Sequence, residues 1–204
     1  MVELEEIYNF SKKLGKVKFS DLVKHSSGFN IIPIDLTDKL HSEIINKLKL
    51  ALENFVKTTR KATRFTGARV NDIGSTLENT ITEEMRKTDL GVTKLSLSGY
   101  PDLIIEYKTT TAYLELKSSG NKNKAGTQHR LFYYTSGKKI TKNAPHLLLQ
   151  IELTEVKDKI WAVDSWVLRD LSGLIVSLKT EFNANQKNFD NLGILAEGHG
   201  SEKK

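Results

Sequence analysis

The segment GYPDLIIEYKTTTAYLELKSSG, residues Gly99–Gly120, is the stretch around which we interpret the rest of this sequence. Two short apolar runs, residues 103–105 and 112–116, flank a polar Lys-Thr-Thr-Thr sequence. Apolar runs separated by a short polar turn are typical of an antiparallel hairpin. We therefore predict two paired strands at this point of the chain.

The hairpin separates its side chains onto two faces. A turn centred between Thr109 and Thr110 places Asp102 opposite Lys117. Because alternate residues of a strand share a face, Glu115 points to the same side as these two. The opposite face receives only apolar side chains, namely Leu103, Ile105, Leu114 and Leu116. One face of the hairpin is therefore predicted to be core, and the other to hold two carboxylates and an amine.

This set of polar groups suggests metal chemistry. Two neighbouring carboxylates repel each other, which raises a pKa unless a cation lies between them. Mg²⁺ prefers carboxylate and carbonyl oxygens, and it commonly takes one or two protein carboxylates together with substrate phosphate. A lysine beside such a metal can orient water or neutralise phosphate charge.

Pro101-Asp102 followed by Glu115-Leu116-Lys117 resembles the PD-(D/E)xK nuclease motif. Within that superfamily the sequence is most similar to the type II restriction endonucleases, over roughly Val70–Val167. The resemblance implies Mg²⁺-dependent hydrolysis of a DNA phosphodiester, with Asp102, Glu115 and Lys117 as catalytic residues. It also implies that Asp102, Glu115 and the carbonyl of Leu116 hold the metal.

Two other interpretations of the motif were weighed. Glu106-Tyr107-Lys108 has the same ExK pattern, but it begins only four residues after Asp102 on the same predicted strand, so we reject it. The hairpin could also be an ordinary one that carries a surface Glu–Lys pair, an arrangement that contributes little to stability.

Members of the resembled family carry an acidic residue on a helix before the Pro-Asp strand, where it faces the metal site. Residues 70–87 have apolar side chains at helical spacing, and Glu78 lies at the edge of that apolar stripe. We therefore expect Glu78 to complete the metal site. Asp72, Glu83 and Glu84 are the alternatives.

Basic and amide side chains gather in two segments that lack acidic residues, residues 54–71 and 117–151. Phosphate repels carboxylates, so a surface that lies along DNA tends to lose them. Lys, Arg, Asn and Gln also contact phosphates and base edges. A solvated basic loop is the alternative for the first segment. The candidate DNA contacts are Arg60, Lys61, Arg64, Arg69, Ser118, Asn121, Lys122, Asn123, Lys124, Gln128, His129, Arg130, Lys138 and Lys139.

Composition limits the class of protein. The chain has 204 residues, a net charge of +6 and no cysteine, which suits a reducing cytoplasm and a basic surface. No apolar run reaches membrane-spanning length, and the N-terminus is acidic, unlike a signal peptide. No glycine-rich phosphate loop is recognisable, so no nucleotide cofactor is expected. We expect a cytoplasmic prokaryotic protein.

The fold predicted is α/β or α+β: N-terminal helices and then a mixed sheet of about five strands with helices packed on it. One nuclease domain is expected over residues 1–204, with a helical part (1–66) that serves in dimerisation and DNA contact, a catalytic core (67–197) and a tail (198–204). Helices are predicted at residues 2–14, 20–25, 36–57, 70–87 and 171–182, and further strands at 92–97, 129–134, 147–153 and 159–163, with a flexible segment at 118–128.

The activity expected is that of a type II restriction enzyme that cuts double-stranded DNA at a short palindromic site as a homodimer, a state that rests on the resemblance alone. A structure-specific nuclease of the same fold, such as a resolvase or repair enzyme, is one alternative. A non-catalytic DNA-binding protein is the other, although such a protein would not need like charges on one face.

Overall fold

The computed structural model describes residues 16–61, 65–95, 99–120, 134 and 136–177. Nearly all of them belong to one compact unit, Val17–Val176, and the chain ends form a second unit of which only Lys16 and Ser177 are described. Among the described residues no helix is long and apolar enough to cross a membrane.

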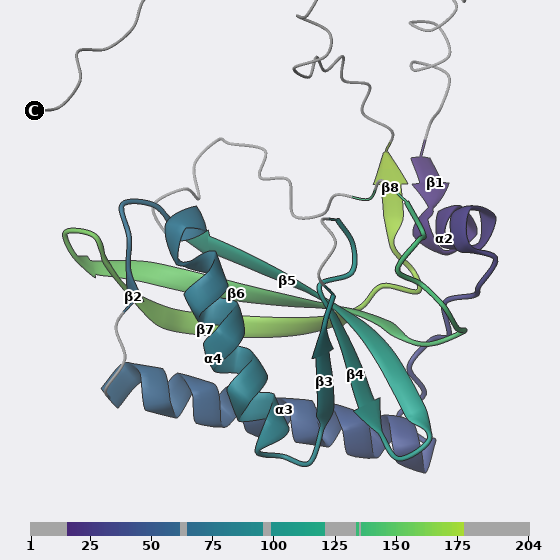
Figure 1. Cartoon of the computed structure of the whole chain (residues 1–204), viewed down its shortest axis with the longest axis horizontal. Helices are drawn as coiled ribbons and strands as arrows, with labels where there is room; N and C mark the ends of the chain where they lie inside the picture. The colour runs from purple at the N-terminus through teal and green to yellow at the C-terminus, as the bar shows by residue number, and fades with distance from the viewer. Residues whose placement is uncertain (1–15, 62–64, 96–98, 121–133, 135, 178–204) are drawn as a thin grey trace, which may run out of the picture. The chain divides into compact units, whose positions relative to one another are not determined.

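A six-stranded sheet forms the centre of the larger unit (Figure 1). Its strands, in spatial order, are β2 (Phe65–Thr66), β7 (Ile160–Asp170), β6 (His146–Lys157), β5 (Thr110–Gly120), β4 (Leu103–Tyr107) and β3 (Gly91–Lys94). Neighbouring strands are antiparallel except for the parallel pair β5–β6. The predicted mixed sheet with helices is confirmed, with six strands instead of about five. The arrangement is consistent with a restriction-endonuclease-like fold.

Two helices pack against the sheet in the main core. They are α3 (Lys39–Lys61) and α4 (Gly74–Arg86), which follows a short 3-10 helix, η1 (Val70–Ile73). Apolar side chains of both helices and of the central strands are buried together there, including Leu48, Phe55, Ile81, Leu114 and Leu149. These helices were predicted, because a stripe at helical spacing has to be buried against another element.

The starts of both helices differ from the prediction. Asp38 caps α3, because its Oδ1 accepts the backbone N–H groups of Leu40 and His41 at 2.8 and 2.9 Å. Gly74 is the first residue of α4 instead of an interior one, so the helix does not carry the cost of a glycine within it.

The predicted helix at residues 171–182 is wrong over its described part. Residues 171–174 form a turn, and Ile175–Ser177 is a short strand, β8, in a two-stranded sheet with β1 (Lys16–Lys18). The Leu171 N–H donates to the carbonyl of His146 at 2.8 Å, which holds this part of the chain on the sheet. Two β-branched residues at 175–176 suit the extended state.

The bounds of several other elements differ from the predicted ones. The helix predicted at 20–25 is α2 (Phe19–Ser27), and β6 is the central strand that the apolar run at 147–153 predicted. Residues 118–120 belong to β5 and not to a flexible segment, and β7 continues to Asp170. The helix predicted at 2–14, and residues 121–133 of the flexible segment and strand, lie outside the described residues.

Candidate active site

The turn of the hairpin fixes which residues face each other. Leu103 pairs with Leu114 and Tyr107 with Thr110, so the two turn residues are Lys108 and Thr109. The pairing between the two strands is shifted by two residues from the prediction. One residue beyond the Leu103–Leu114 pair, Asp102 lies opposite Glu115 instead of opposite Lys117. A shift of two preserves the faces of a strand. The apolar and polar sides of the hairpin are therefore those predicted.

Asp102 is held by hydrogen bonds through its backbone and its side chain. Its N–H donates to the Leu114 carbonyl at 3.2 Å, and its own carbonyl accepts from the Leu95 N–H at 2.9 Å. Its carboxylate Oδ2 accepts the Leu116 N–H at 2.7 Å. These bonds fix the Asp102 carboxylate between β4 and β5, beside Glu115.

Glu115 is the most buried acid of the hairpin. Its side chain is 3% exposed, and its Oε1 lies 2.5 Å from Lys117 Nζ. Burial raises the pKa of Glu115 to about 7; the neighbouring Asp102 raises it too, through its charge and a side-chain contact, while Lys117 opposes the shift. The other oxygen, Oε2, is buried without a hydrogen-bond partner among the described residues.

A hollow of about 120 Å³ lies where β5 continues past the end of β4. It is lined by Gly74, Leu77, Glu78 and Ile81 of α4, by Leu116, Lys117 and Ser118 of β5, and by Ile151 of β6. Side chains from the predicted catalytic strand and from the predicted acidic helix thus meet at one place.

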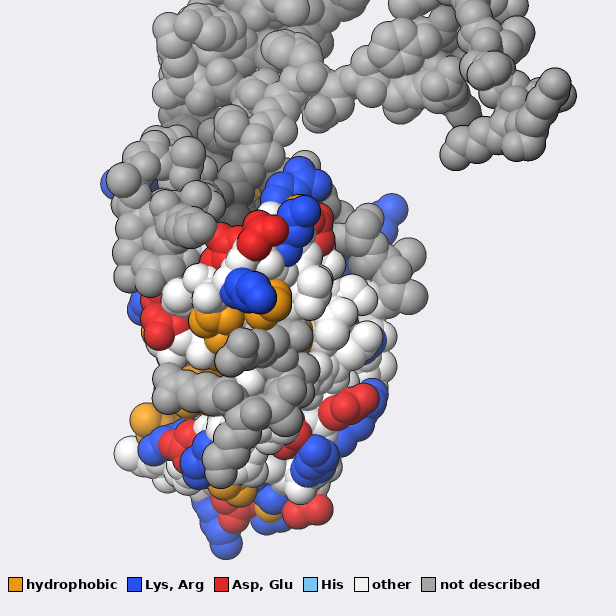
Figure 2. All heavy atoms as spheres, turned by 90° about the vertical axis from the view of Figure 1, so that its left-hand side faces the viewer, with side chains coloured by type: hydrophobic (Ala, Val, Ile, Leu, Met, Phe, Trp, Pro, Cys, Tyr) orange, Lys and Arg blue, Asp and Glu red, His pale blue; other side chains and the backbone are white. Residues whose placement is uncertain are grey.

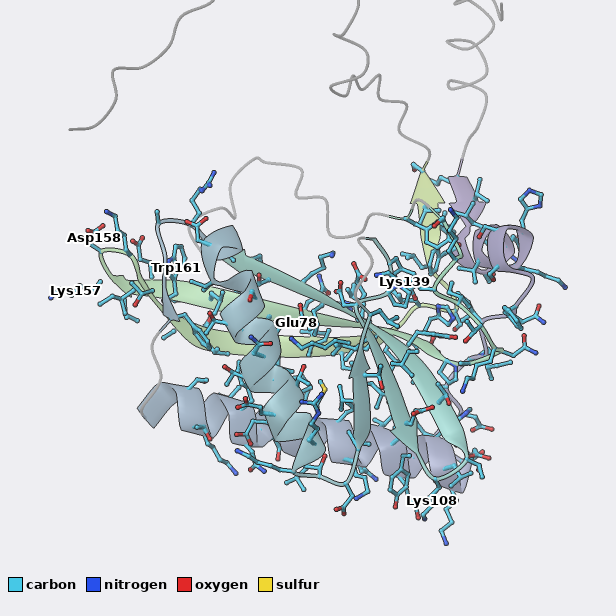
Figure 3. The ribbon with its side chains drawn as sticks, viewed as in Figure 1. Glu78, Lys108, Lys139, Lys157, Asp158 and Trp161 are labelled. Carbon is cyan, nitrogen blue, oxygen red and sulfur yellow. The ribbon has the colours of Figure 1, made fainter. Side chains whose placement is uncertain are left out.

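Glu78 faces this region from α4 (Figure 3). Its carboxylate is 2.8 Å from Lys94 Nζ and one-third exposed. Among the described residues, no group of three or more acidic or histidine side chains is close enough to hold one metal ion. Glu78 as the third acid of the metal site therefore stays a prediction.

The three alternatives to Glu78 lie differently. Asp72 is in η1 and pairs with Arg69 at 3.5 Å. Glu84 is buried and pairs with Lys87 at 2.6 Å. Glu83 is exposed. None of the three lines the hollow, so Glu78 remains the helix acid best placed for the site.

The donor set fits a hard divalent cation. Two neighbouring carboxylates repel, and a buried carboxylate oxygen without a partner is costly. An Mg²⁺ ion bound by Asp102 and Glu115 would relieve both costs, since it prefers carboxylate oxygens. The residues present thus fit the metal that the motif implies.

Sequence reasoning missed several polar residues on the same face of the sheet. Gln150 lies beside Lys117 in the parallel β5–β6 register and accepts from Arg169 Nε at 2.7 Å. Tyr100 Oη and His146 Nδ1 are 2.6 Å apart, and both residues are buried. A glutamine inside the apolar run of residues 147–153 was the available signal, because a central strand rarely carries a polar side chain without a role.

The candidate DNA contacts differ in how exposed their side chains are. Arg69 and Lys138 are exposed, and Ser118 lines the hollow. Lys139 is only 9% exposed and donates to backbone carbonyls, so its contact with DNA stays a prediction that this burial does not favour. The side chains of Arg60, Lys61, Arg64, Asn121, Lys122, Asn123, Lys124, Gln128, His129 and Arg130 lie outside the described part.

One face of the molecule is seen in Figure 2, at the end of the sheet with the β6–β7 turn. The described basic and acidic side chains are interspersed on it. Lys157 and Asp158 lie together at the tip of this turn (Figure 3).

The fold and the hairpin define a nuclease-like α+β protein. Residues 13–191 match the family described as "Type II restriction enzyme MjaV family". The chain is also 30% identical over 209 residues to the type II restriction enzyme MjaV of Methanocaldococcus jannaschii, covering 91% of this chain and 90% of that protein. The chain belongs to the MjaV family of type II restriction enzymes, which are site-specific deoxyribonucleases.

Proposed function

We propose that this enzyme hydrolyses double-stranded DNA at a short palindromic site in a Mg²⁺-dependent reaction carried out by Asp102, Glu115 and Lys117. The observation that carries the proposal is the buried Glu115, which is beside Asp102 and only 2.5 Å from Lys117. Like charges are expensive to bury together. An arrangement of this kind is expected where a cation and a phosphate complete it.

Each residue has a distinct role in the proposed reaction. Asp102 and Glu115 bind the metal through carboxylate oxygens, with the carbonyl of Leu116 as a third ligand. Lys117 donates hydrogen bonds to the phosphate or to the attacking water, and its charge opposes the negative charge that develops in the transition state. Bound Mg²⁺ would supply a Lewis acid and lower the pKa of its water.

Glu78 is proposed to act from α4, as a ligand of a second metal or by positioning water. Its present partner is Lys94, at 2.8 Å. Both side chains are about one-third exposed, so exchanging this partner for water or a metal costs little. A Glu78→Gln variant should therefore lower the cleavage rate with little effect on folding.

DNA contact is proposed for the two acid-free segments, with Lys138 and Arg69 as the predicted contacts that the structure describes as exposed. Neutralising a phosphate contact weakens binding in a salt-dependent way. Lys138→Ala should reduce DNA affinity and flatten its dependence on salt concentration. Unchanged binding by both Lys138→Ala and Arg130→Ala would remove the acid-free segment from the interface.

A homodimer is proposed because one set of Asp102, Glu115 and Lys117 can cut one strand, and a palindromic site has the two-fold symmetry of a dimer. Light scattering of the purified protein, with and without DNA, measures this directly. A monomer in both states would contradict it.

Incubation of the protein with a long sequenced duplex, with Mg²⁺ and with chelator, tests the proposed function. Discrete fragments that require Mg²⁺ are expected, and their ends would give the recognition site. Discrete fragments in chelator would refute the metal requirement. Cutting only at branched or damaged DNA would refute the palindromic site.

A further inference from the structure

The buried Lys139 contacts the turn that leads into Asp102. Its Nζ donates to the carbonyl of Gly99 at 2.5 Å and to the carbonyl of Pro101 at 2.8 Å. The side chain comes from a part of the chain almost 40 residues further on, and it is only 9% exposed. Burying an ammonium group is costly unless its donors are paired, so this contact is a specific feature of the structure.

The peptide group between Pro101 and Asp102 is held from both of its sides. Its carbonyl accepts from Lys139, and its N–H donates to the carbonyl of Leu114 at 3.2 Å. The orientation of this peptide sets where the Asp102 side chain leaves the backbone. The carboxylate is then fixed by the Leu116 N–H at 2.7 Å. Lys139 is thus the member of this network that comes from outside β3, β4 and β5.

The loop that carries Lys139 is itself firmly held. The N–H of Ile140 donates to the Gly137 carbonyl at 2.9 Å, and Ile140 is buried in the second apolar cluster. A Cβ added at Gly137 would lie 2.8 Å from the backbone nitrogen of Ser27, so this loop packs directly against the end of α2. A rigid base of this kind lets one lysine fix the position of the Gly99–Asp102 turn.

We propose that Lys139 is a positioning residue that holds the Gly99–Asp102 turn so that the Asp102 carboxylate is placed for metal before metal or DNA binds. The inference rests on the proposed role of Asp102 as a ligand. Groups that orient metal ligands typically change metal affinity or activity about 10- to 100-fold when they are removed. Lys139 itself contacts neither metal nor DNA.

Lys139→Met is the main test, since it keeps an unbranched side chain but removes the charge and the donors. Lys24→Met is the matched control, because Lys24 is an exposed lysine of α2, against which the loop of Lys139 packs, and it lies outside both acid-free segments. Amide hydrogen exchange is measured first, in metal-free protein. We expect exchange at Asp102 and Leu116 to be faster in Lys139→Met than in the wild type, and unchanged in Lys24→Met.

Metal and DNA affinity are measured separately. Calorimetry with Mg²⁺ alone is expected to show about tenfold weaker binding for Lys139→Met. DNA affinity in chelator is expected to stay within about twofold of the wild type, and single-turnover cleavage to fall by about 10- to 100-fold. Wild-type exchange, metal affinity and cleavage in Lys139→Met would overturn the proposal. Weakened DNA binding with wild-type metal affinity would overturn it as well, because Lys139 would then be a DNA contact.

Lys139→Arg decides the matter if the Met variant does not fold. The planar guanidinium cannot take the position of a buried ammonium without moving the turn, so weaker Mg²⁺ binding with unchanged DNA affinity is again expected. Wild-type metal affinity in a folded Arg variant would overturn the proposal, as would failure of both variants to fold. If the wild type neither binds Mg²⁺ nor cuts DNA, the proposed function itself fails. If the wild type does both and the Lys139 variants do so equally well, only the inference about Lys139 fails.

Discussion

The two faces of β5 differ in what they bury. Ala112 and Leu114 belong to the main apolar core under α3 and α4. Tyr113 and Glu115 alternate with them and are as deeply buried. Tyr113 belongs to the second apolar cluster, whereas Glu115 lies beside Asp102 and Lys117. One strand thus supports the fold with one face and carries the candidate site on the other.

Burial on the site face shifts the pKa values of its titratable groups in the direction that favours their uncharged forms. Burial lowers the pKa of His146 to about 4 and raises that of Glu115 to about 7. It also raises the pKa of Tyr100 well above its usual value. His146 Nε2 and Glu115 Oε2 have no hydrogen-bond partner among the described residues. This face therefore costs the fold stability, and a cation bound between Asp102 and Glu115 would restore part of it.

Asp102→Asn should have the largest effect on function. Loss of a ligand carboxylate should lower the cleavage rate by at least about 1,000-fold. DNA affinity in chelator should rise several-fold, because one negative charge near the phosphates is removed. Single-turnover cleavage and a binding titration measure the two effects. Asp158→Asn, at the exposed β6–β7 turn, is the control. Cleavage by Asp102→Asn at the same rate as Asp158→Asn would contradict the assignment of Asp102 to the active site.

Leu149→Ala probes the apolar face. Leu149 is fully buried on the central strand β6, so the change should lower the free energy of unfolding by about 2–5 kcal/mol. Cleavage by the protein that remains folded should stay near wild type, because Leu149 pairs with Leu116 on the apolar face and offers no group to the metal or the phosphate. Chemical denaturation and an assay at low temperature check both. Val167→Ala, at a 42% exposed position, should cost far less.

Glu115→Gln should stabilise the metal-free protein at high pH. The folded pKa of Glu115 is raised to about 7 from 4.5, so its contribution to stability is present below pH 4.5 and is lost as the pH rises through 7. A shift of this size corresponds to at most roughly 3 kcal/mol. Denaturation in chelator at pH 8 should find the variant more stable than wild type.

The same denaturation series contains its own control. Mg²⁺ at pH 8 should stabilise the wild type and not Glu115→Gln, since only the wild type offers the ionised pair. Between pH 6.5 and about 4 Glu115→Gln should lose stability, because His146 stays neutral in the folded protein, with its pKa lowered to about 4, but is protonated in the unfolded chain. In the wild type, protonation of Glu115 over the same pH range opposes this loss. Equal stability of the two proteins at pH 8 in chelator would contradict the buried carboxyl.

Tyr100→Phe should have the smallest effect. It removes the 2.6 Å contact to His146 Nδ1 and leaves that nitrogen without a partner, which costs about 1–3 kcal/mol. Cleavage should change little, because neither residue is a proposed ligand of the metal. Thermal unfolding measures the loss. A cleavage defect comparable to that of Asp102→Asn would show that Tyr100 takes part in catalysis and does not only support the structure.

The sequence was sufficient to predict the hairpin, its two faces and the central strand, because period-two alternation follows directly from strand geometry. The register was not predictable to the residue. The turn uses Lys108 at a φ of 52°, a conformation that glycine or asparagine would have signalled. The two-residue error in the register does not change which face a side chain is on, so Asp102, Glu115 and Lys117 still share one face.

Lys139 could not be placed from its sequence neighbours. It lies in a long basic segment where exposed lysines are the rule, and its partners are carbonyls of a turn far away in the chain. The helix predicted at residues 171–182 failed for a related reason. The apolar spacing of these residues is compatible with a helix or with a strand, and pairing between β8 and β1 favours the strand.

The most direct test of the central claim compares two glutamates of the same hairpin. Glu115 and Glu106 each begin an ExK sequence, but Glu106 is exposed at the far end of β4. Single-turnover cleavage of duplex DNA in Mg²⁺ is measured for Glu115→Gln and Glu106→Gln. The account predicts loss of cleavage by at least about 1,000-fold with retained DNA binding for Glu115→Gln, and a near wild-type rate for Glu106→Gln. Cleavage by Glu115→Gln at the wild-type rate, or loss of cleavage only in Glu106→Gln, would contradict it.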